Sequence, residues 1–410
     1  MKFIVNVWNA QLLLLISSIS TYAFLNFGVL PLNLSHIITL LIFMVILALA
    51  LLQVKIKLNK PLLLLFLAFA VLSVYSLVIF SDMQKIKNLI NFFIFFFVSA
   101  VVTTNCDKLK IVTYYIMMTK LFVFFALLQM VLYYSHLGNL YTFSFLGLKE
   151  VNLSTSGYFI RLFSLATEPA ALCGILLPAI YLSINRIINK EKQVSLRYAI
   201  IVIFVVLNTF SLIGYLYIFI ALIMAFYYGG KISFGKIALL IFAMFIFIIL
   251  IMQAESIQQR VSEATSLDSI ASSDNLSIMA VYSNILIMLE VLKEYPLLGG
   301  GIFNHPHFYD MYISMFYSGG APRVELNKDE AASLYIRSLS ETGILGFVSL
   351  VGLLMYILKR CTRKGCYNAY AISFALAFIL LGIRAGSVNY IIIWFYFFGA
   401  LRLSDKEQSS

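Results

Sequence analysis

The sequence predicts an all-α, polytopic membrane protein that forms a single integral membrane domain over residues 1–410. Of its 410 residues, 62% are hydrophobic, only 11% are charged, and the mean hydropathy is +0.96. Soluble domains are about half apolar and about a quarter charged. Apolar runs of roughly 20 residues recur along the chain, which suits spanning helices rather than the alternating pattern of a membrane barrel.

About twelve transmembrane helices are predicted, with both termini on the same side. The runs fall at about 10–29, 36–53, 61–80, 88–104, 111–134, 168–185, 197–209, 211–228, 234–252, 343–358, 369–385 and 388–402. The short pair at 197–228 could also form a shallow hairpin around Asn208–Ser211, and the topology would be unchanged. The first run follows Lys2 and shows no small-residue cleavage signature, so it is expected to be a retained signal-anchor.

The net charge of +11 reflects membrane topology rather than a nucleic-acid partner. If the N-terminus is cytoplasmic, 18 of the 29 basic residues fall in five inside loops and the two tails. They are Lys2, Lys55, Lys57, Lys60, Lys108, Lys110, Arg186, Lys190, Lys192, Arg197, Lys231, Lys236, Lys359, Arg360, Arg363, Lys364, Arg402 and Lys406. Because basic residues concentrate in cytoplasmic loops, both termini are predicted to be cytoplasmic.

Two outer loops are long, at about 135–167 and 253–342. The second holds eleven acidic and five basic residues. Loops of this length are uncommon unless they serve a function. Ile278–Leu292 within it is interpreted as a helix that lies at the membrane interface or covers a cavity. If it crossed the membrane instead, Lys359–Lys364 would move to the outside.

No metal site or disulfide framework is predicted. The four cysteines (Cys106, Cys173, Cys361 and Cys366) are best read as free thiols, although the last two could be ligands by their spacing. His305 and His307 flank a proline and could also bind a metal. Without a carboxylate at metal-site spacing, they are more often ordinary loop residues.

The first candidate site runs from Arg161 to Glu168 and Pro169, where the first outer loop leads into a span. Proline suits the first turn of a helix, and an acid there is favoured by the helix dipole, so Glu168 could be an ordinary helix start. Arg161 is harder to explain in that way. An arginine beside lipid is costly unless it meets an anion or water, and its planar guanidinium matches phosphate oxygens.

Further arginines are expected at the outer membrane plane. Arg260 follows the ninth span, Arg337 lies near the start of the tenth, and Arg384 lies at the outer end of the eleventh. Each one alone could pair with an acid of the outer loop. Together they favour a bound polyanion such as a lipid diphosphate.

Two more segments stand out in the second outer loop. Pro296–Gly301 ends in three glycines, which permit positive φ and the close approach of another chain. The segment from Tyr335 to Gly346 is predicted to be helical, with Arg337 and Glu341 four residues apart, a spacing that also allows a plain intrahelical ion pair.

Taken in order, these segments resemble the O-antigen polymerase/ligase superfamily (the Wzy-type proteins). The resemblance covers about residues 155–350. It consists of the Arg161–Pro169 segment, the Thr209–Gly214 turn, Arg260, the Pro296–Gly301 segment and the Tyr335–Gly346 helix. Ala166 replaces the usual glycine before Glu-Pro. Ligases of the superfamily carry His-Asn at the positions of Ala332 and Ser333, so the resemblance favours a polymerase.

The resemblance implies a C-type glycosyltransferase-like fold in the bacterial inner membrane. It implies transfer of a growing glycan from undecaprenyl diphosphate to another lipid-linked repeat unit at the periplasmic face. Arg161, Glu168 and Arg260 are then the expected catalytic residues. The expected substrate-binding residues are Tyr335, Arg337, Glu341 and Arg384. The implied partners are the lipid-linked oligosaccharide, membrane lipids and a chain-length regulator, with no cofactor. An O-antigen ligase and a polysaccharide flippase or transporter without chemistry remain the alternatives.

Overall fold

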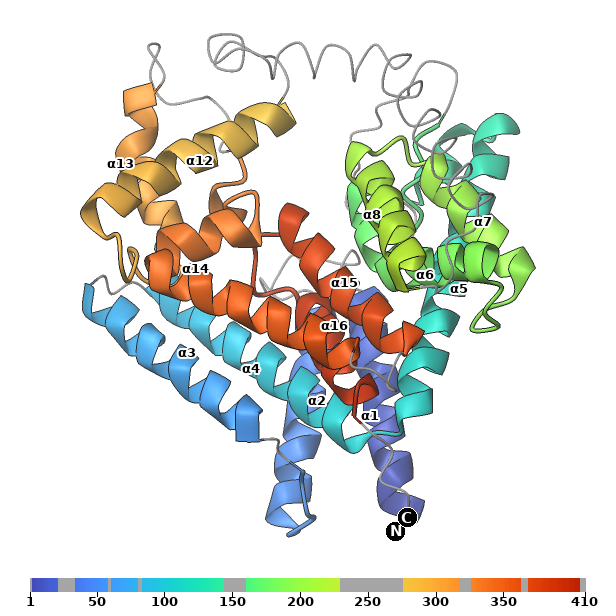
Figure 1. Ribbon diagram of the computed structural model, residues 1–410, viewed down its shortest axis with the longest axis horizontal. Helices are drawn as coiled ribbons and strands as arrows, with labels where there is room; N and C mark the ends of the chain where they lie inside the picture. Colours follow the sequence, from blue (N-terminus) through green and yellow to red (C-terminus); the bar gives the residue numbers. More distant parts are fainter. Residues whose placement is uncertain are drawn as a thin grey trace.

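The computed structural model describes residues 2–20, 34–57, 60–79, 83–143, 160–228, 276–316, 326–362 and 368–405. Within these residues all regular structure is helical and no strand occurs, as the sequence predicts. The helices run in the order α1 (Lys2–Ser20), α2 (Leu34–Leu51), α3 (Lys60–Ile79), α4 (Met83–Asn105), α5 (Lys108–Tyr134), η1 (Gly138–Thr142), α6 (Pro169–Asn189), α7 (Leu196–Leu207), α8 (Leu212–Tyr228), α12 (Leu276–Glu294), α13 (His305–Phe316), η3 (Lys328–Glu330), α14 (Leu334–Cys361), α15 (Ala369–Arg384) and α16 (Ile391–Leu403) (Figure 1).

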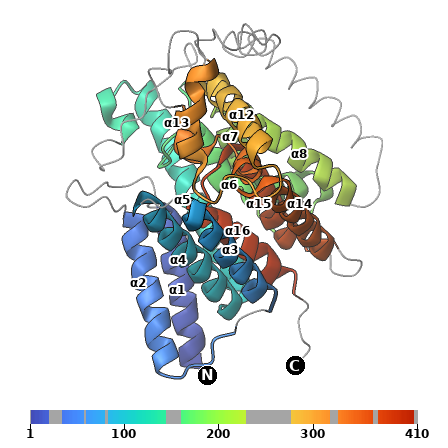
Figure 2. The same cartoon turned by 90° about the vertical axis from the view of Figure 1, so that its left-hand side faces the viewer.

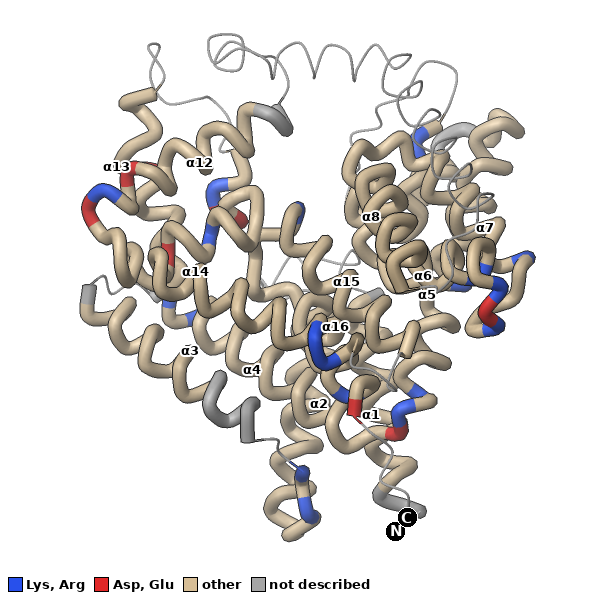
Figure 3. Tube along the Cα trace, in the orientation of Figure 1, with Lys and Arg blue, Asp and Glu red and all other residues tan. Residues whose placement is uncertain are grey.

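Five of the described helices are long and apolar enough to cross a membrane: α2, most of α4, α5, α6 and α14. They carry exposed apolar side chains such as Met44 on α2 and Met355 on α14. Charged residues gather mainly at helix ends and connections and leave most of the helix bodies uncharged (Figure 3). These faces suit contact with lipid. The count of twelve spans remains a prediction.

The centre of the bundle holds α6 against α15 and α16. Pro178 lies inside α6 and has no backbone N–H to donate to the carbonyl of Gly174, so one hydrogen bond of the helix is missing. The hydroxyl of Tyr396 on α16 donates to that carbonyl at 3.1 Å. On α5, the hydroxyl of Tyr115 accepts from Ala179 N at 3.1 Å and donates to Ile175 O at 3.0 Å. Two buried tyrosines thus satisfy the backbone groups that the proline disturbs, as an apolar environment requires.

Several connections predicted to be cytoplasmic meet at one end of the bundle, where both chain termini also lie (Figures 1 and 2). Lys108 donates to the carbonyl of Asp405 at 2.7 Å, and Arg360 forms an ion pair with the Asp405 carboxylate. Asn368 at the start of α15 bonds to Leu403 O at 3.1 Å. Helices α12 and α13 lie at the opposite end. The basic connections and the second outer segment therefore occupy opposite ends of the bundle.

The first helix begins earlier than the predicted start at residue 10. The side chains of Asn9 and Gln11 are both buried in α1. Asn9 Oδ1 accepts a hydrogen bond from Asp107 N at 3.2 Å. A tertiary partner thus satisfies this buried polar group. The ninth predicted span, 234–252, lies outside the described residues.

The predicted second outer loop contains helices in its described parts. The interfacial helix predicted at Ile278–Leu292 corresponds to α12, which packs on α13 and α14 and is not among the helices suited to crossing. The predicted pair at 197–228 corresponds to α7 and α8. With 12 residues, α7 rises only about 18 Å, short of an apolar core about 30 Å thick. This length agrees with the shallow hairpin.

Candidate functional site

The Pro296–Gly301 segment docks backbone to backbone on a break in α14. Gly343 interrupts that helix with φ 63° and ψ −164°. The amide of Ile344 donates to Pro296 O at 3.0 Å, and Gly300 N donates to Ser340 O at 2.8 Å. A Cβ on Gly299 would lie 2.5 Å from the Gly343 amide nitrogen. The glycines that the sequence singled out are thus needed for this approach, which joins two motifs of the resemblance.

Arg337 and Glu341 form a buried ion pair directly beside this junction. Their side chains are 4% and 5% exposed, and Arg337 Nε lies 3.0 Å from Glu341 Oε1. Arg337 Nη1 also donates to Asp329 O at 3.0 Å and to Gly386 O at 3.3 Å, and the guanidinium lies over the Phe303 ring. Breaking a buried pair leaves an uncompensated charge, so the two residues act as one unit.

His305 belongs to a buried polar chain on the same side of α14. Its Nδ1 is 2.8 Å from Ser340 Oγ, and its Nε2 is 2.7 Å from Asn284 Oδ1 on α12. Burial, with a smaller effect of the Arg337 charge, lowers the pKa of His305 to about 3. Both ring nitrogens are engaged by protein groups, so His305 ties α13 to α12 and α14. No group of three or more potential metal ligands occurs within the described residues.

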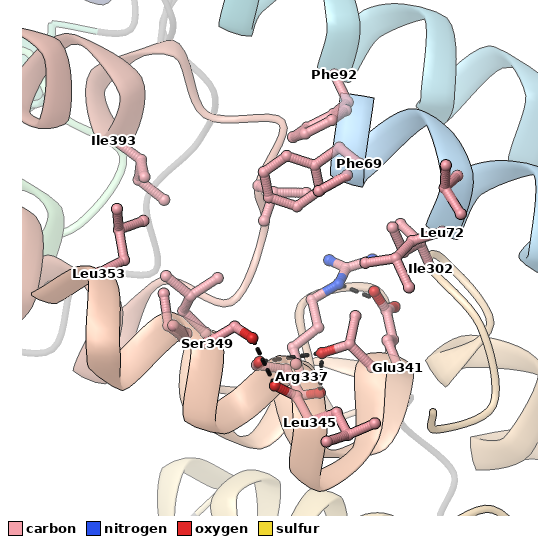
Figure 4. Close-up of a pocket in the computed structure, with 18 of the residues that line it drawn as sticks. Phe69, Leu72, Phe92, Ile302, Arg337, Glu341, Leu345, Ser349, Leu353 and Ile393 are labelled. Atoms are coloured by element: carbon pink, nitrogen blue, oxygen red, sulfur yellow. Dashed lines mark hydrogen bonds and ion pairs between the residues drawn. The ribbon is translucent and has the colours of Figure 1, made fainter. Parts of the chain in front are cut away.

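An apolar cavity of about 490 Å³ adjoins the ion pair, between α3, α4, α14 and α16. In Figure 4, Arg337 and Glu341 lie side by side at one end, whereas Leu353 and Ile393 lie at the other. Phe69 of α3 also lines it. The volume falls within the range of about 300–1,000 Å³ usual for ligand sites. Such a lining suits a hydrocarbon chain.

A second ion pair joins Glu168 at the start of α6 to Arg384 at the end of α15. Arg384 Nη2 lies 2.6 Å from Glu168 Oε1, and the two side chains are 34% and 45% exposed. Glu330 of η3 lies within range of this pair's charges and accepts a hydrogen bond from the Tyr390 hydroxyl. Counting the Arg337 pair, four carboxylates and two guanidiniums therefore converge from α6, α14, α15 and η3.

Arg161, in the segment before α6, contacts the turn between α7 and α8. Its Nε donates to Thr209 O at 3.4 Å, and the amide of Leu162 donates to Asn208 O at 3.0 Å. The positive charge of Arg161 is close enough to interact electrostatically with Cys173 on α6. The Arg161–Pro169 segment and the Thr209 turn, which are separate in the sequence, are thus adjacent in the structure.

The structure brings four of the predicted site residues together in two pairs. It pairs Glu168 with Arg384 and Arg337 with Glu341. Tyr335 donates through its hydroxyl to Ile379 O at 2.7 Å, which fixes it against α15. The predicted residue Arg260 lies outside the described residues.

Sequence reasoning assigned no individual role to Glu330, Tyr390 or the buried partners of His305. Glu330 and Tyr390 are 60 residues apart in the chain, and no local pattern signals such a contact. Asn284 and Ser340 offered a weak signal, because each is a polar residue in a helical run that is otherwise largely apolar.

Comparisons with protein-family models and with curated proteins find no match for this chain.

Proposed function

We propose that the protein is an O-antigen-type polymerase of the bacterial inner membrane. It would move a growing glycan from undecaprenyl diphosphate onto the sugar of another lipid-linked repeat unit at the periplasmic face. The donor brings its own activation, so the reaction needs no nucleotide and no cofactor. It needs cations for the leaving diphosphate, a base for the attacking hydroxyl, and space for a lipid chain.

The observation that carries the proposal is the position of Arg337 between an apolar cavity and a charged cluster. On one side it lines the cavity. On the other it bonds to the carbonyls of Asp329 and Gly386, which border Glu330 and the Glu168–Arg384 pair. A substrate that is apolar at one end and anionic at the other would match both environments.

The proposed roles follow from exposure and charge. Arg384 is partly exposed, so a diphosphate could share its guanidinium with Glu168. Arg161, together with Arg260, is proposed to complete the cationic site, because a guanidinium offers two parallel hydrogen bonds to phosphate. The deeply buried Arg337 and Glu341 would instead fix the floor of the site beside the lipid chain.

The test is elongation by the purified protein in lipid nanodiscs, with the undecaprenyl-diphosphate-linked repeat unit as the only sugar substrate. We expect products with several repeats still attached to the lipid, resolved by gel or mass spectrometry. Transfer only after lipid A–core is added would indicate a ligase. Movement of the lipid-linked unit across a vesicle membrane without a new bond would indicate a flippase. Either result would overturn the proposal.

A matched pair of variants sharpens the assay. Arg384→Lys keeps the charge but removes the planar guanidinium, and it should slow elongation by about 10²–10³, the usual effect of losing a donor aimed at developing charge. Arg360→Lys, at the opposite end of the bundle beside Asp405, should elongate at the rate of the unaltered protein. Equal rates for both variants would remove Arg384 from the proposed site.

A further inference from the structure

Glu330 is held by an unusual backbone turn. The two residues that follow it, Ala331 and Ala332, both have left-handed backbones, with φ of 51° and 56°. Such conformations are unfavourable for residues with a Cβ and persist only where surrounding contacts enforce them. Backbone strain of this kind is concentrated at functional sites. Its position next to Glu330 therefore makes Glu330 a candidate functional residue.

The contacts that enforce the turn come from the loop after α15. A Cβ at Gly386 would lie 1.4 Å from Glu330 O, so only glycine allows this approach. Arg337 Nη1 bridges the two segments through Asp329 O and Gly386 O. Ser333 Oγ donates to Gly382 O at 3.1 Å. The Glu330 carboxylate is therefore fixed in place by backbone packing on both sides of the turn.

Charged groups surround this carboxylate from four elements. Arg384 of α15 and Arg337 of α14 are the cations in range, while Glu168 at the start of α6 and the neighbouring Asp329 are the anions. The titratable Tyr390, just before α16, donates a hydrogen bond to Glu330 Oε1. Glu330 thus lies next to the cation proposed to meet the diphosphate.

Other carboxylates in this part of the structure are held in ion pairs. Glu341 is buried against Arg337 at 3.0 Å, and Glu168 bonds to Arg384 at 2.6 Å. Asp310 is paired with Lys328 at 2.8 Å. Glu330, by contrast, accepts its hydrogen bond from a neutral hydroxyl. It is half-buried and so remains reachable from outside the protein.

The environment of Glu330 also favours proton uptake. Burial raises the pKa of Glu330 above its ordinary value, while Arg384 and Arg337 act in the opposite direction. Glu168 and Asp329 add to the rise. A carboxylate with a raised pKa is a better proton acceptor once it is ionised, because base strength follows pKa.

We propose that Glu330 is the general base of the transfer and accepts the proton of the attacking sugar hydroxyl. This inference rests on the proposed polymerase function. The acceptor O–H bond breaks and its proton passes to the Glu330 carboxylate, while the oxygen forms a bond to the anomeric carbon of the donor. The bond from that carbon to the diphosphate oxygen breaks, and its electron pair leaves on the diphosphate beside Arg384. The proton on Glu330 then passes to water.

The experiment measures elongation against pH for the full-length protein in nanodiscs, with the undecaprenyl-diphosphate-linked repeat unit as substrate. We compare Glu330→Gln, Glu330→Asp and the control Glu290→Gln, which removes a carboxylate that pairs with Lys293 on α12. A general base contributes about 10²–10⁴ in rate. Glu330→Gln should therefore lose that factor in kcat with KM nearly unchanged, and Glu290→Gln should stay within about twofold of the unaltered protein.

The pH profile separates a catalytic from a structural role. The rate of the unaltered protein should rise with pH through the pKa of Glu330 and then level off, because only the ionised form accepts a proton. Glu330→Asp should shift this rising limb of the pH–rate profile along the pH axis, and Glu330→Gln should lack the rising limb. If the unaltered protein elongates and Glu330→Gln matches it, or if the Asp variant keeps an unshifted limb, Glu330 is not the base. If the unaltered protein makes no polymer, the proposed function itself fails.

Discussion

Replacing Gly343 by alanine tests the junction between α14 and the Pro296–Gly301 segment. Gly343 has φ 63° and ψ −164°, a region that is essentially restricted to glycine and costs other residues about 1–3 kcal/mol. A Cβ there would also lie 2.5 Å from Leu297 O. Relieving this clash would weaken the Ile344–Pro296 and Leu345–Leu297 hydrogen bonds, worth about 0.5–1.5 kcal/mol each. The expected loss of unfolding free energy is therefore about 2–6 kcal/mol.

A matched control lies on the same helix. A Cβ at Gly352 meets nothing within 4 Å, and alanine is favoured over glycine inside a helix by about 0.5–1 kcal/mol. Unfolding can be followed in detergent with a thiol-reactive dye, because Cys106, Cys173 and Cys361 are buried. Gly343→Ala should unfold several degrees below the unaltered protein, and Gly352→Ala at the same temperature or higher. Equal midpoints for the two variants would refute the docked junction.

Three further predictions concern single side chains. Arg337→Met should lower the free energy of unfolding by about 3–5 kcal/mol, because it leaves Glu341 buried and unpaired. Adding Glu341→Met should recover most of this loss. The same dye assay measures both variants, and equal losses of stability would contradict the prediction. Arg161→Lys should slow transfer about 10²–10³-fold and so shorten the glycan chains seen on a gel. The control Arg197→Lys, at the exposed start of α7, should leave the chain length unchanged. Chains of normal length from both variants would exclude Arg161 from the cationic site. Burial keeps His305 neutral and lowers its pKa from 6.5 to about 3. The free energy of unfolding should therefore decrease by up to about 1.4 kcal/mol per pH unit as the pH falls below 6.5. His305→Gln should make this decrease less steep, and an unchanged slope would exclude His305 as its source.

Most helix positions could be predicted from the sequence because long apolar runs report burial in lipid or in the core directly. The predicted spans at 111–134 and 369–385 correspond closely to α5 and α15. The first span was predicted to begin at about residue 10, whereas α1 begins at Lys2 and its Asn9 bonds to Asp107 in a distant turn. Element type thus follows from local composition, whereas boundaries depend on tertiary contacts.

The candidate site could be predicted only in part. Glu168 and Arg384 each stood out at a helix end, but their pairing joins residues 216 positions apart. The glycines of Pro296–Gly301 indicated a close approach, but not that the approaching chain is the break at Gly343. Glu330 carried no local signal, since its environment comes from α6, α14, α15 and Tyr390. A site assembled from distant segments needs the structure.

The lipopolysaccharide of a strain that lacks this gene tests the proposed polymerase most directly. If the protein polymerises lipid-linked repeat units, flipping and ligation survive its loss, and the core should carry a single repeat in place of a long ladder. Restoring the gene should restore the ladder, and a copy with Arg384→Lys should give only short chains. Bare core without any repeat would contradict the account, because it would place the defect in ligation or flipping.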